Sequence, residues 1–525
     1  MASITVSRHL FTFTTALGIS LFSSAGWAAR DFTPQSGTWV ISAELNGQPG
    51  RGLGIDVQGN TFAMQMFGYE KNGDATFYTA VGQMQGNTVS APLVRYTGGR
   101  SFGSEPRDAQ EDKVLGDVKL SFSNGLQGTL QLPGEPEVAI ERYVFTGRDS
   151  PYYQSERWMR AKRYAVWLAL NEQGQVVADW KAELQWGLQD PMPLILRKGA
   201  LTNTLECTRP AHKETIRCEA VDATQAPSVQ AAEFRMVGSQ TAGSISLREG
   251  AVAPLLLQGV NTRTDFPYRG AIQTGCCING LESFSSNFPG VYYGSSPVYM
   301  PSNGVWIVQD ELTGKPGRGI SLDAQGDLLT MQVFAYQANG QPTFFMGVGG
   351  YQQESERSYT STATLVLNQY KGGRSVGGAP AIAELAQSAG EVRVSVLGGF
   401  DRSLALAQVQ FPGEALKTMQ RLPMELPQST AEKLFGEWYF SWFQANGMPI
   451  TTTLNRMDGD MAANEDGSVK CRYSAEAGEF NCLRSTSPSN TSRFKSPDDF
   501  FLSSDYFRVR DRHGNWMGLG NIPLD

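Results

Sequence analysis

The chain has 525 residues, and its 57 glycines and 18% charged residues favour many tight turns over long solvated helices. The formal net charge is −7 and no cluster of lysine and arginine is present, so the chain lacks the basic surface that nucleic-acid binding requires. The length suffices for about two to four domains, each with its own core, and the composition favours an all-β protein.

The first 28 residues have the layout of a secretory signal peptide. A weakly basic start with Arg8 is followed by an apolar stretch from Leu10 to about Leu21 and by small residues ending at Ala28. We therefore expect an exported protein, periplasmic, at the cell surface or extracellular. No later apolar run is long enough for a transmembrane helix, so we expect no transmembrane segment after cleavage.

The chain contains one sequence pattern twice. Residues 37–82 match residues 304–349 at a constant offset of 267, with 22 of 46 positions identical. After an insertion in the second copy, Tyr96-x-Gly-Gly-Arg-Ser matches the same motif from Tyr370, and Pro-Gly-Glu at 133–135 matches Pro-Gly-Glu at 412–414. A repeat of this length predicts two equivalent folded modules.

Each copy is expected to open with one β module. Runs with strand periodicity fall at 38–45, 52–58, 60–69, 75–83, 87–96, 116–122, 126–132 and 138–145, separated by turn sequences such as Asn72-Gly73. About eight antiparallel strands with turns every 8 to 12 residues predict a barrel or a sandwich.

The whole chain then divides into six parts. We predict an all-β tandem duplication in which each copy is an approximately eight-stranded antiparallel barrel or sandwich followed by a smaller disulfide-containing β module. The parts are a signal peptide (1–28), the first β module (29–148), its disulfide-containing module (149–269), a Gly/Ser/Pro-rich linker (270–302), the second β module (303–425) and its disulfide-containing module (426–525).

The six cysteines form three pairs in the sequence. Cys207 and Cys218 are eleven residues apart, as are Cys471 and Cys482, which predicts one disulfide in each trailing module. Cys276 and Cys277 are adjacent and have no counterpart, so the sequence leaves their state open.

Charged residues that recur in both copies are the candidates for chemistry. Glu44 and Asp56 recur as Glu311 and Asp323, and a pair of carboxylates can act as acid and base on a glycosidic bond. The structural alternative is that Arg51 and Arg318 pair with these carboxylates and fix the hairpins. The mature part of the chain has only His212 and His513, without ligand spacing, so we expect no metal site and no cofactor.

Two further features suggest ligand binding. Gly98-Gly99-Arg100-Ser101 and its copy around Arg374 can form an anion-binding loop, or a turn whose arginine is neutralised within the protein. A stripe of one amide and two aromatic rings recurs along one strand of each copy, and in a closed barrel it either lines a small-ligand pocket or fills the interior. The predicted ligand-binding residues are Gln65, Phe67, Tyr69, Gln332, Phe334, Tyr336, Arg100 and Arg374.

The combined motifs Pro-Gly-Arg-Gly, Phe-x-Tyr-x-x-Asn-Gly and Tyr-x-Gly-Gly-Arg-Ser resemble a repeat found in exported proteobacterial proteins that have no established activity. The resemblance covers residues 37–106 and 304–380 and implies an extracytoplasmic β-rich module. It implies nothing about a substrate.

The leading functional hypothesis is an exported, non-enzymatic binding or surface protein with two equivalent β modules, whose ligand is an unknown small molecule, a glycan or a cell-surface polymer. Two linked sites would gain avidity on a repetitive ligand. One alternative is a secreted glycosidase-like hydrolase that uses the paired carboxylates, and another is a structural envelope protein.

Overall fold

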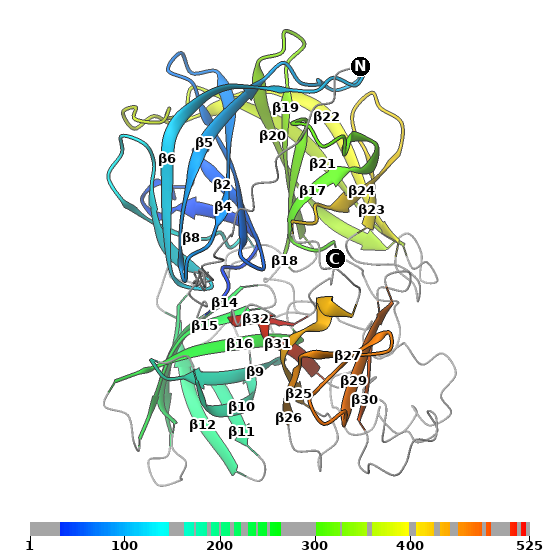
Figure 1. The fold of residues 1–525 in the computed structure, drawn as a ribbon. Helices are drawn as coiled ribbons and strands as arrows, with labels where there is room; N and C mark the ends of the chain where they lie inside the picture. Colours follow the sequence, from blue (N-terminus) through cyan, green and yellow to red (C-terminus); the bar gives the residue numbers. More distant parts are fainter. Residues whose placement is uncertain are drawn as a thin grey trace, which may run out of the picture.

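The computed structural model describes residues 32–145, 162–263, 301–424 and parts of 431–520, with short gaps inside the last three ranges (Figure 1). The predicted signal peptide, Cys276 and Cys277, both histidines of the mature part and residues 270–300 of the predicted linker lie outside the described residues.

The first barrel is a closed ring of eight antiparallel strands in sequence order, with the last strand paired to the first. Its strands are β1 (Gly37–Ile41), β2 (Gly52–Gln58), β3 (Thr61–Tyr69), β4 (Ala75–Gln83), β5 (Thr88–Thr97), β6 (Gln110–Asn124), β7 (Gln127–Gln131) and β8 (Val138–Arg142). A single 3-10 turn, η1 (Ser42–Glu44), follows β1.

The third barrel along the chain has the same strand order as the first and closes in the same way. We call the first and third barrels the outer barrels, after their places in the sequence. Its strands are β17 (Gly304–Val308), β18 (Gly319–Gln325), β19 (Leu328–Tyr336), β20 (Pro342–Gln353), β21 (Thr360–Lys371), β22 (Glu384–Leu397), β23 (Leu406–Gln410) and β24 (Lys417–Arg421), with η3 (Gln309–Glu311) after β17. The registers correspond as well: Gly37 pairs with Ile55 in the first barrel, and Gly304 pairs with Leu322 in the second.

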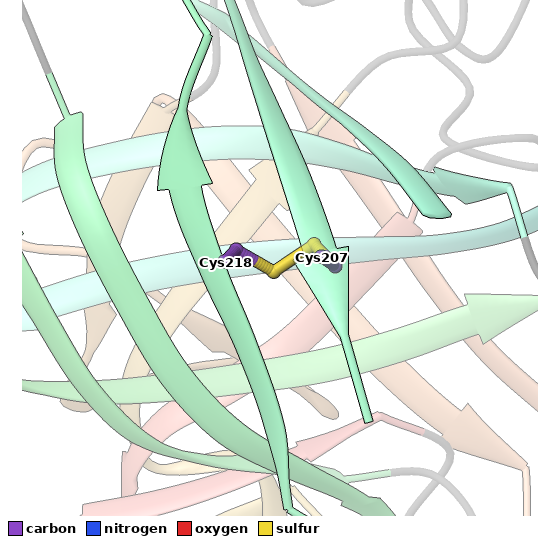
Figure 2. Close-up of a disulfide and its surroundings, with 2 residues drawn as sticks. All are labelled: Cys207 and Cys218. Atoms are coloured by element: carbon purple, nitrogen blue, oxygen red, sulfur yellow. A yellow bond between two sulfur atoms is a disulfide. The ribbon is translucent and has the colours of Figure 1, made fainter. Parts of the chain in front are cut away.

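A middle barrel of eight antiparallel strands lies between them in the sequence. Its strands are β9 (Lys162–Leu170), β10 (Val176–Gln185), β11 (Met192–Lys198), β12 (Leu201–Thr208), β13 (Ile216–Ala220), β14 (Val229–Val237), β15 (Gln240–Leu247) and β16 (Leu255–Arg263). β12 and β13 place Cys207 opposite Cys218, and the predicted disulfide between them is formed (Figure 2).

The described part of the C-terminal region forms two four-stranded sheets. One consists of β25 (Gly436–Ser441), β26 (Ile450–Leu454), β31 (Asp505–Asp511) and β32 (Trp516–Gly520), and the other of β27 (Arg456–Asp458), β28 (Met461–Ala463), β29 (Val469–Ser474) and β30 (Glu479–Arg484). A 3-10 turn, η4 (Glu432–Leu434), precedes β25. Cys471 lies opposite Cys482 in the register, but the Cys482 side chain is outside the described residues, so the second disulfide stays a prediction.

The all-β prediction is confirmed, and the modules that were expected to be barrels or sandwiches are barrels. The module after the first copy is not a smaller unit, because it has the same eight strands as the outer barrels. Each barrel has its own apolar interior, built from alternate residues of its strands. Leu168 and Leu170 of β9 extend the core of the first barrel, so the middle barrel packs directly against it.

Candidate functional site

The predicted aromatic stripe does not line either barrel. On β3 the interior face carries Phe62, Met64 and Met66, while Phe67 and Tyr69 point out of the barrel. These two rings lie in a separate apolar cluster that combines side chains from both outer barrels: Phe67, Tyr69, Ala75, Phe77, Ala109, Phe334, Tyr336, Phe344 and Ala383. We call the surface around this cluster the interbarrel interface.

Ring contacts cross this interface in equivalent pairs. Phe67 and Tyr69 contact Phe344, with ring centroids 5.2 and 5.7 Å apart. Their counterparts Phe334 and Tyr336 contact Phe77, each at 5.6 Å. Phe77 and Phe344 are themselves equivalent positions of the repeat, so the outer barrels meet through the same surface. The arrangement has the reciprocity of a two-fold symmetric contact.

Backbone hydrogen bonds show the same reciprocity. The amide of Gly98 donates to the carbonyl of Gly340, and the amide of Gly372 donates to the carbonyl of Gly73, both at 2.8 Å. Ala109 donates to Pro316, and Ala383 donates to Pro49. Because each contact has an equivalent with the roles of the two barrels exchanged, the interface is self-complementary.

The candidate carboxylates Asp56 and Asp323 lie in the same interface. Asp323 accepts two hydrogen bonds of 2.6 Å from the guanidinium of Arg142 in the first barrel, and it also accepts the amide of Thr38 at 2.9 Å. Asp56 accepts one hydrogen bond of 2.6 Å from Arg421 and the amide of Val305 at 2.9 Å. Both aspartates are almost fully buried.

The other candidate carboxylates belong to a second pair of networks. Glu44 accepts hydrogen bonds from Arg51 of its own barrel and from Arg374 of the other barrel, the latter at 3.0 Å. Glu135 also accepts a hydrogen bond from Arg51, and it accepts one of 2.7 Å from the amide of Gly377 in the opposite barrel.

The equivalent network joins Arg318 to Glu311 and Glu414, with Arg100 donating to Glu311 at 2.9 Å from the first barrel. The arginines of both Gly-Gly-Arg-Ser loops are thus neutralised by carboxylates of the other barrel.

These networks shift the pKa values of Glu135, Glu414 and Arg51. Burial by itself would raise the pKa of Glu135, but the hydrogen bonds from Arg51 and Gly377 outweigh burial and lower it. The pKa of Glu414 is lowered in the same way by Arg318. Burial would lower the pKa of Arg51, but the hydrogen bonds with Glu135 and Glu44 raise it. Glu135 and Glu414 are therefore held ionised, which suits ion pairing and not the role of a proton donor.

The glycines of the Gly-Gly-Arg-Ser loops allow close approach of the two barrels. A Cβ atom at Gly99 would lie 2.2 Å from the ring of Tyr336, and one at Gly373 would lie 2.1 Å from the ring of Tyr69. Each tyrosine ring therefore packs on a glycine of the other barrel. Burial raises the pKa of both phenols, so both tyrosines are neutral at physiological pH.

The stripe glutamines are also in the interface. Gln332 donates to Thr38 of the first barrel at 3.0 Å, and a Cβ at Gly319 would lie 2.3 Å from Nε2 of Gln65. The structure thus brings together all the predicted ligand-binding residues, but between the barrels and not around an open site. Their assignment to an external ligand stays a prediction.

Sequence reasoning did not identify the partners that complete these networks. Arg142, Arg421, Glu135 and Glu414 recur at equivalent places in both copies, and that recurrence of charge was the signal that could have found them. Only the packing of one barrel against the other shows which acid meets which base.

Among the described residues, no group of three or more potential ligands is arranged to hold a metal ion, and no helix is both long and apolar enough to cross a membrane. No protein-family model matches the chain, and a search of curated proteins finds no match. The fold and the interface define a protein of three antiparallel eight-stranded barrels in which the two outer barrels are paired face to face.

Proposed function

We propose that this chain is an exported, non-enzymatic structural protein of the cell envelope, in which two tandem copies of one barrel form a single rigid body. One observation carries the proposal: the charged residues that recur in both copies as site candidates are all paired with charges within or across the interbarrel interface. These retained charged residues therefore serve the pairing of the copies.

This pairing argues against the hydrolase alternative. A catalytic acid or base must reach the bond it cleaves, but Glu44 is held by Arg51 and Arg374, and Asp56 is held by Arg421 with its side chain 0% exposed. The lowered pKa values of neighbouring Glu135 and Glu414 are those of structural ion pairs. Export is supported by the N-terminal pattern and by the disulfide of the middle barrel, because disulfides persist in oxidising compartments.

A glycan-hydrolysis screen tests the enzymatic part of the proposal. Purified mature protein is incubated with a panel of envelope polysaccharides, beside Glu44→Gln/Glu311→Gln and the exposed control Glu137→Gln. We expect no release of reducing ends by any of the three proteins. Turnover by the parent and the control that is lost in a folded Glu44→Gln/Glu311→Gln variant would establish the hydrolase instead.

The structural part is tested in cells. A strain that lacks the chain is expected to be more sensitive to detergent, and the Glu137→Gln variant should restore resistance. Asp56→Asn/Asp323→Asn, which weakens the barrel pairing, should restore it less well. Full restoration by the weakened variant at equal protein level would show that the pairing is not what the cell requires.

A second candidate function is polymer binding through the outer surface. Leu45 and its counterpart Leu312 are 51% and 47% exposed, and Val81 and Val348 are 60% and 56% exposed, so both copies retain the same exposed apolar residues. Retention at exposed positions is not explained by packing. A glycan and lipid binding screen with Leu45→Ser/Leu312→Ser decides it: binding lost in this variant supports the candidate, and no binding by the parent removes it.

A further inference from the structure

Two buried tryptophans in the middle barrel differ from every other tryptophan whose burial the structure describes. Trp39, Trp306 and Trp438 each donate the indole Nε1–H to the backbone carbonyl four residues earlier, at 2.8, 2.8 and 2.7 Å. Trp167 and Trp180 are equally buried, but neither indole N–H has a hydrogen-bond partner. Buried indole N–H groups normally have one, so two orphans in one barrel require a reason.

The two tryptophans lie at paired positions of neighbouring strands. Trp167 on β9 is directly opposite Trp180 on β10 in the antiparallel register, and both belong to the interior cluster of the barrel. Directly opposite residues on one face have Cβ atoms about 5 Å apart. The same barrel interior therefore holds two N–H donors that no acceptor of the protein uses.

The residues around the indoles are small. Each tryptophan has an alanine two residues before and two residues after it on its strand, at positions 165, 169, 178 and 182, and the register pairs these alanines with one another. On the other side of β9, Gly259 lies opposite Trp167, where a Cβ would be 2.6 Å from Cδ1 and 3.2 Å from Nε1 of the indole. The ring of Phe234 packs edge-on against the ring of Trp167, with ring centroids 4.7 Å apart. The side chains on this face are small or apolar except for Thr241, whose Cβ lies 3.0 Å from the Cβ position at Gly259, and neither indole N–H has a hydrogen-bond partner.

We propose that the interior of the middle barrel binds a small, uncharged, mostly apolar molecule through a carbonyl oxygen that accepts hydrogen bonds from Nε1 of Trp167 and Nε1 of Trp180. An eight-stranded barrel is wide enough to hold one small ligand, and apolar walls with a few oriented donors are typical of such sites. A neutral carbonyl fits better than a carboxylate, because neutral indoles supply no charge to offset a buried anion. The site is distinct from the interbarrel interface.

Titration with a simple ketone tests this in the full chain. The protein is labelled with ¹⁵N-tryptophan, its indole signals are assigned with Trp167→Phe and Trp180→Phe, and acetophenone is added. We expect the Trp167 and Trp180 signals to move downfield together and to saturate. Ethylbenzene, which has a similar shape but no acceptor, should bind at least about tenfold more weakly, as expected for loss of hydrogen bonds in an apolar site.

The variants and controls separate the possible outcomes. Trp167→Phe keeps an aromatic ring but removes the N–H donor, so it should weaken acetophenone binding about tenfold. Trp306→Phe is the control: the N–H of Trp306 already donates to the carbonyl of Ser302, so this variant should bind acetophenone as the parent does. Equal shifts with both compounds, no saturable shift, or exchange peaks between both indole protons and bound water would overturn the proposal. The parent titration alone decides it if a variant does not fold.

Discussion

Removal of the charge of Asp323 is the sharpest perturbation of the interbarrel interface. The Asp323→Asn variant keeps the volume of the side chain but places an NH₂ group against the donors of Arg142, which is 0% exposed. Two charge-assisted hydrogen bonds of 2.6 Å are affected, and a buried guanidinium is left without its counter-charge. Breaking a buried pair from one side typically costs about 3–5 kcal/mol.

The equivalent variant provides an internal comparison. Arg421, which donates a hydrogen bond of 2.6 Å to Asp56, is 8% exposed and so less completely buried than Arg142, and Asp56→Asn should therefore cost less, about 1.5–3 kcal/mol. Asp310→Asn is the matched surface control, because the Asp310 side chain is 62% exposed and forms an exposed ion pair with Lys417. Its expected cost is below about 1 kcal/mol.

Differential scanning calorimetry measures these differences. For a cooperative unit the size of the two outer barrels, about 4 kcal/mol corresponds to a fall in the transition midpoint of about 10 °C. The Cys207→Ser/Cys218→Ser variant removes the disulfide of the middle barrel alone and so identifies the transition of that barrel, which lets the outer-barrel transition be assigned. If Asp323→Asn shifts that transition no more than Asp310→Asn does, or less than Asp56→Asn does, the reasoning from the hydrogen-bond geometry is wrong.

Three further predictions follow from the same contacts. Gly99→Ala should lower the outer-barrel midpoint by several degrees because its Cβ would meet the Tyr336 ring, whereas Gly50→Ala, with no atom within 4 Å of the new Cβ, should leave the midpoint unchanged; equal thermal melts would contradict the close approach. Glu135 and Glu414 have pKa values below the ordinary 4.5, so the stability that they contribute is present above pH 4.5 and is lost as the pH falls through the lowered pKa. The Glu135→Gln and Glu414→Gln variants should therefore lose less stability below about pH 5 than the parent does. An acid-unfolding profile identical to that of the parent would refute the assignment. Cys207→Ser/Cys218→Ser should destabilise the middle barrel by about 3 kcal/mol through loss of loop closure, and calorimetry should show the outer-barrel transition unmoved.

Much of the outer-barrel fold could be predicted from the sequence. The predicted runs 52–58 and 75–83 coincide with β2 and β4, because strand periodicity and Asn-Gly turns are local signals. The middle barrel was harder, since its sequence has no recognisable counterpart to align. The barrel is recognised only in the structure, where β9 pairs with both β10 and β16 and so closes the ring of eight strands.

The contacts of the candidate site could not be predicted from the local sequence. Neither face of residues 60–69 is polar, and this was visible in the sequence, but a strand with two apolar faces can belong to a barrel interior and to an interface at once. The covering surface belongs to the other copy, where Phe344 of β20 lies 277 residues after Phe67 and 275 after Tyr69. No local pattern indicates that Tyr69 packs on Gly373, because that contact depends on how two complete barrels meet.

The central claim is that the two outer barrels meet through equivalent surfaces, and one cross-link tests it directly. Gly54 and Ser321 are equivalent positions of the repeat, and a Cβ at Gly54 would lie 3.0 Å from the Cβ of Ser321, so the two positions face each other across the interface. In the Gly54→Cys/Ser321→Cys variant, mass spectrometry of the non-reduced protein should find an intramolecular disulfide between residues 54 and 321 in most molecules. The control pair Gly54→Cys/Gly317→Cys should give none. Free thiols at both positions in the folded Gly54→Cys/Ser321→Cys protein would contradict the paired-barrel account.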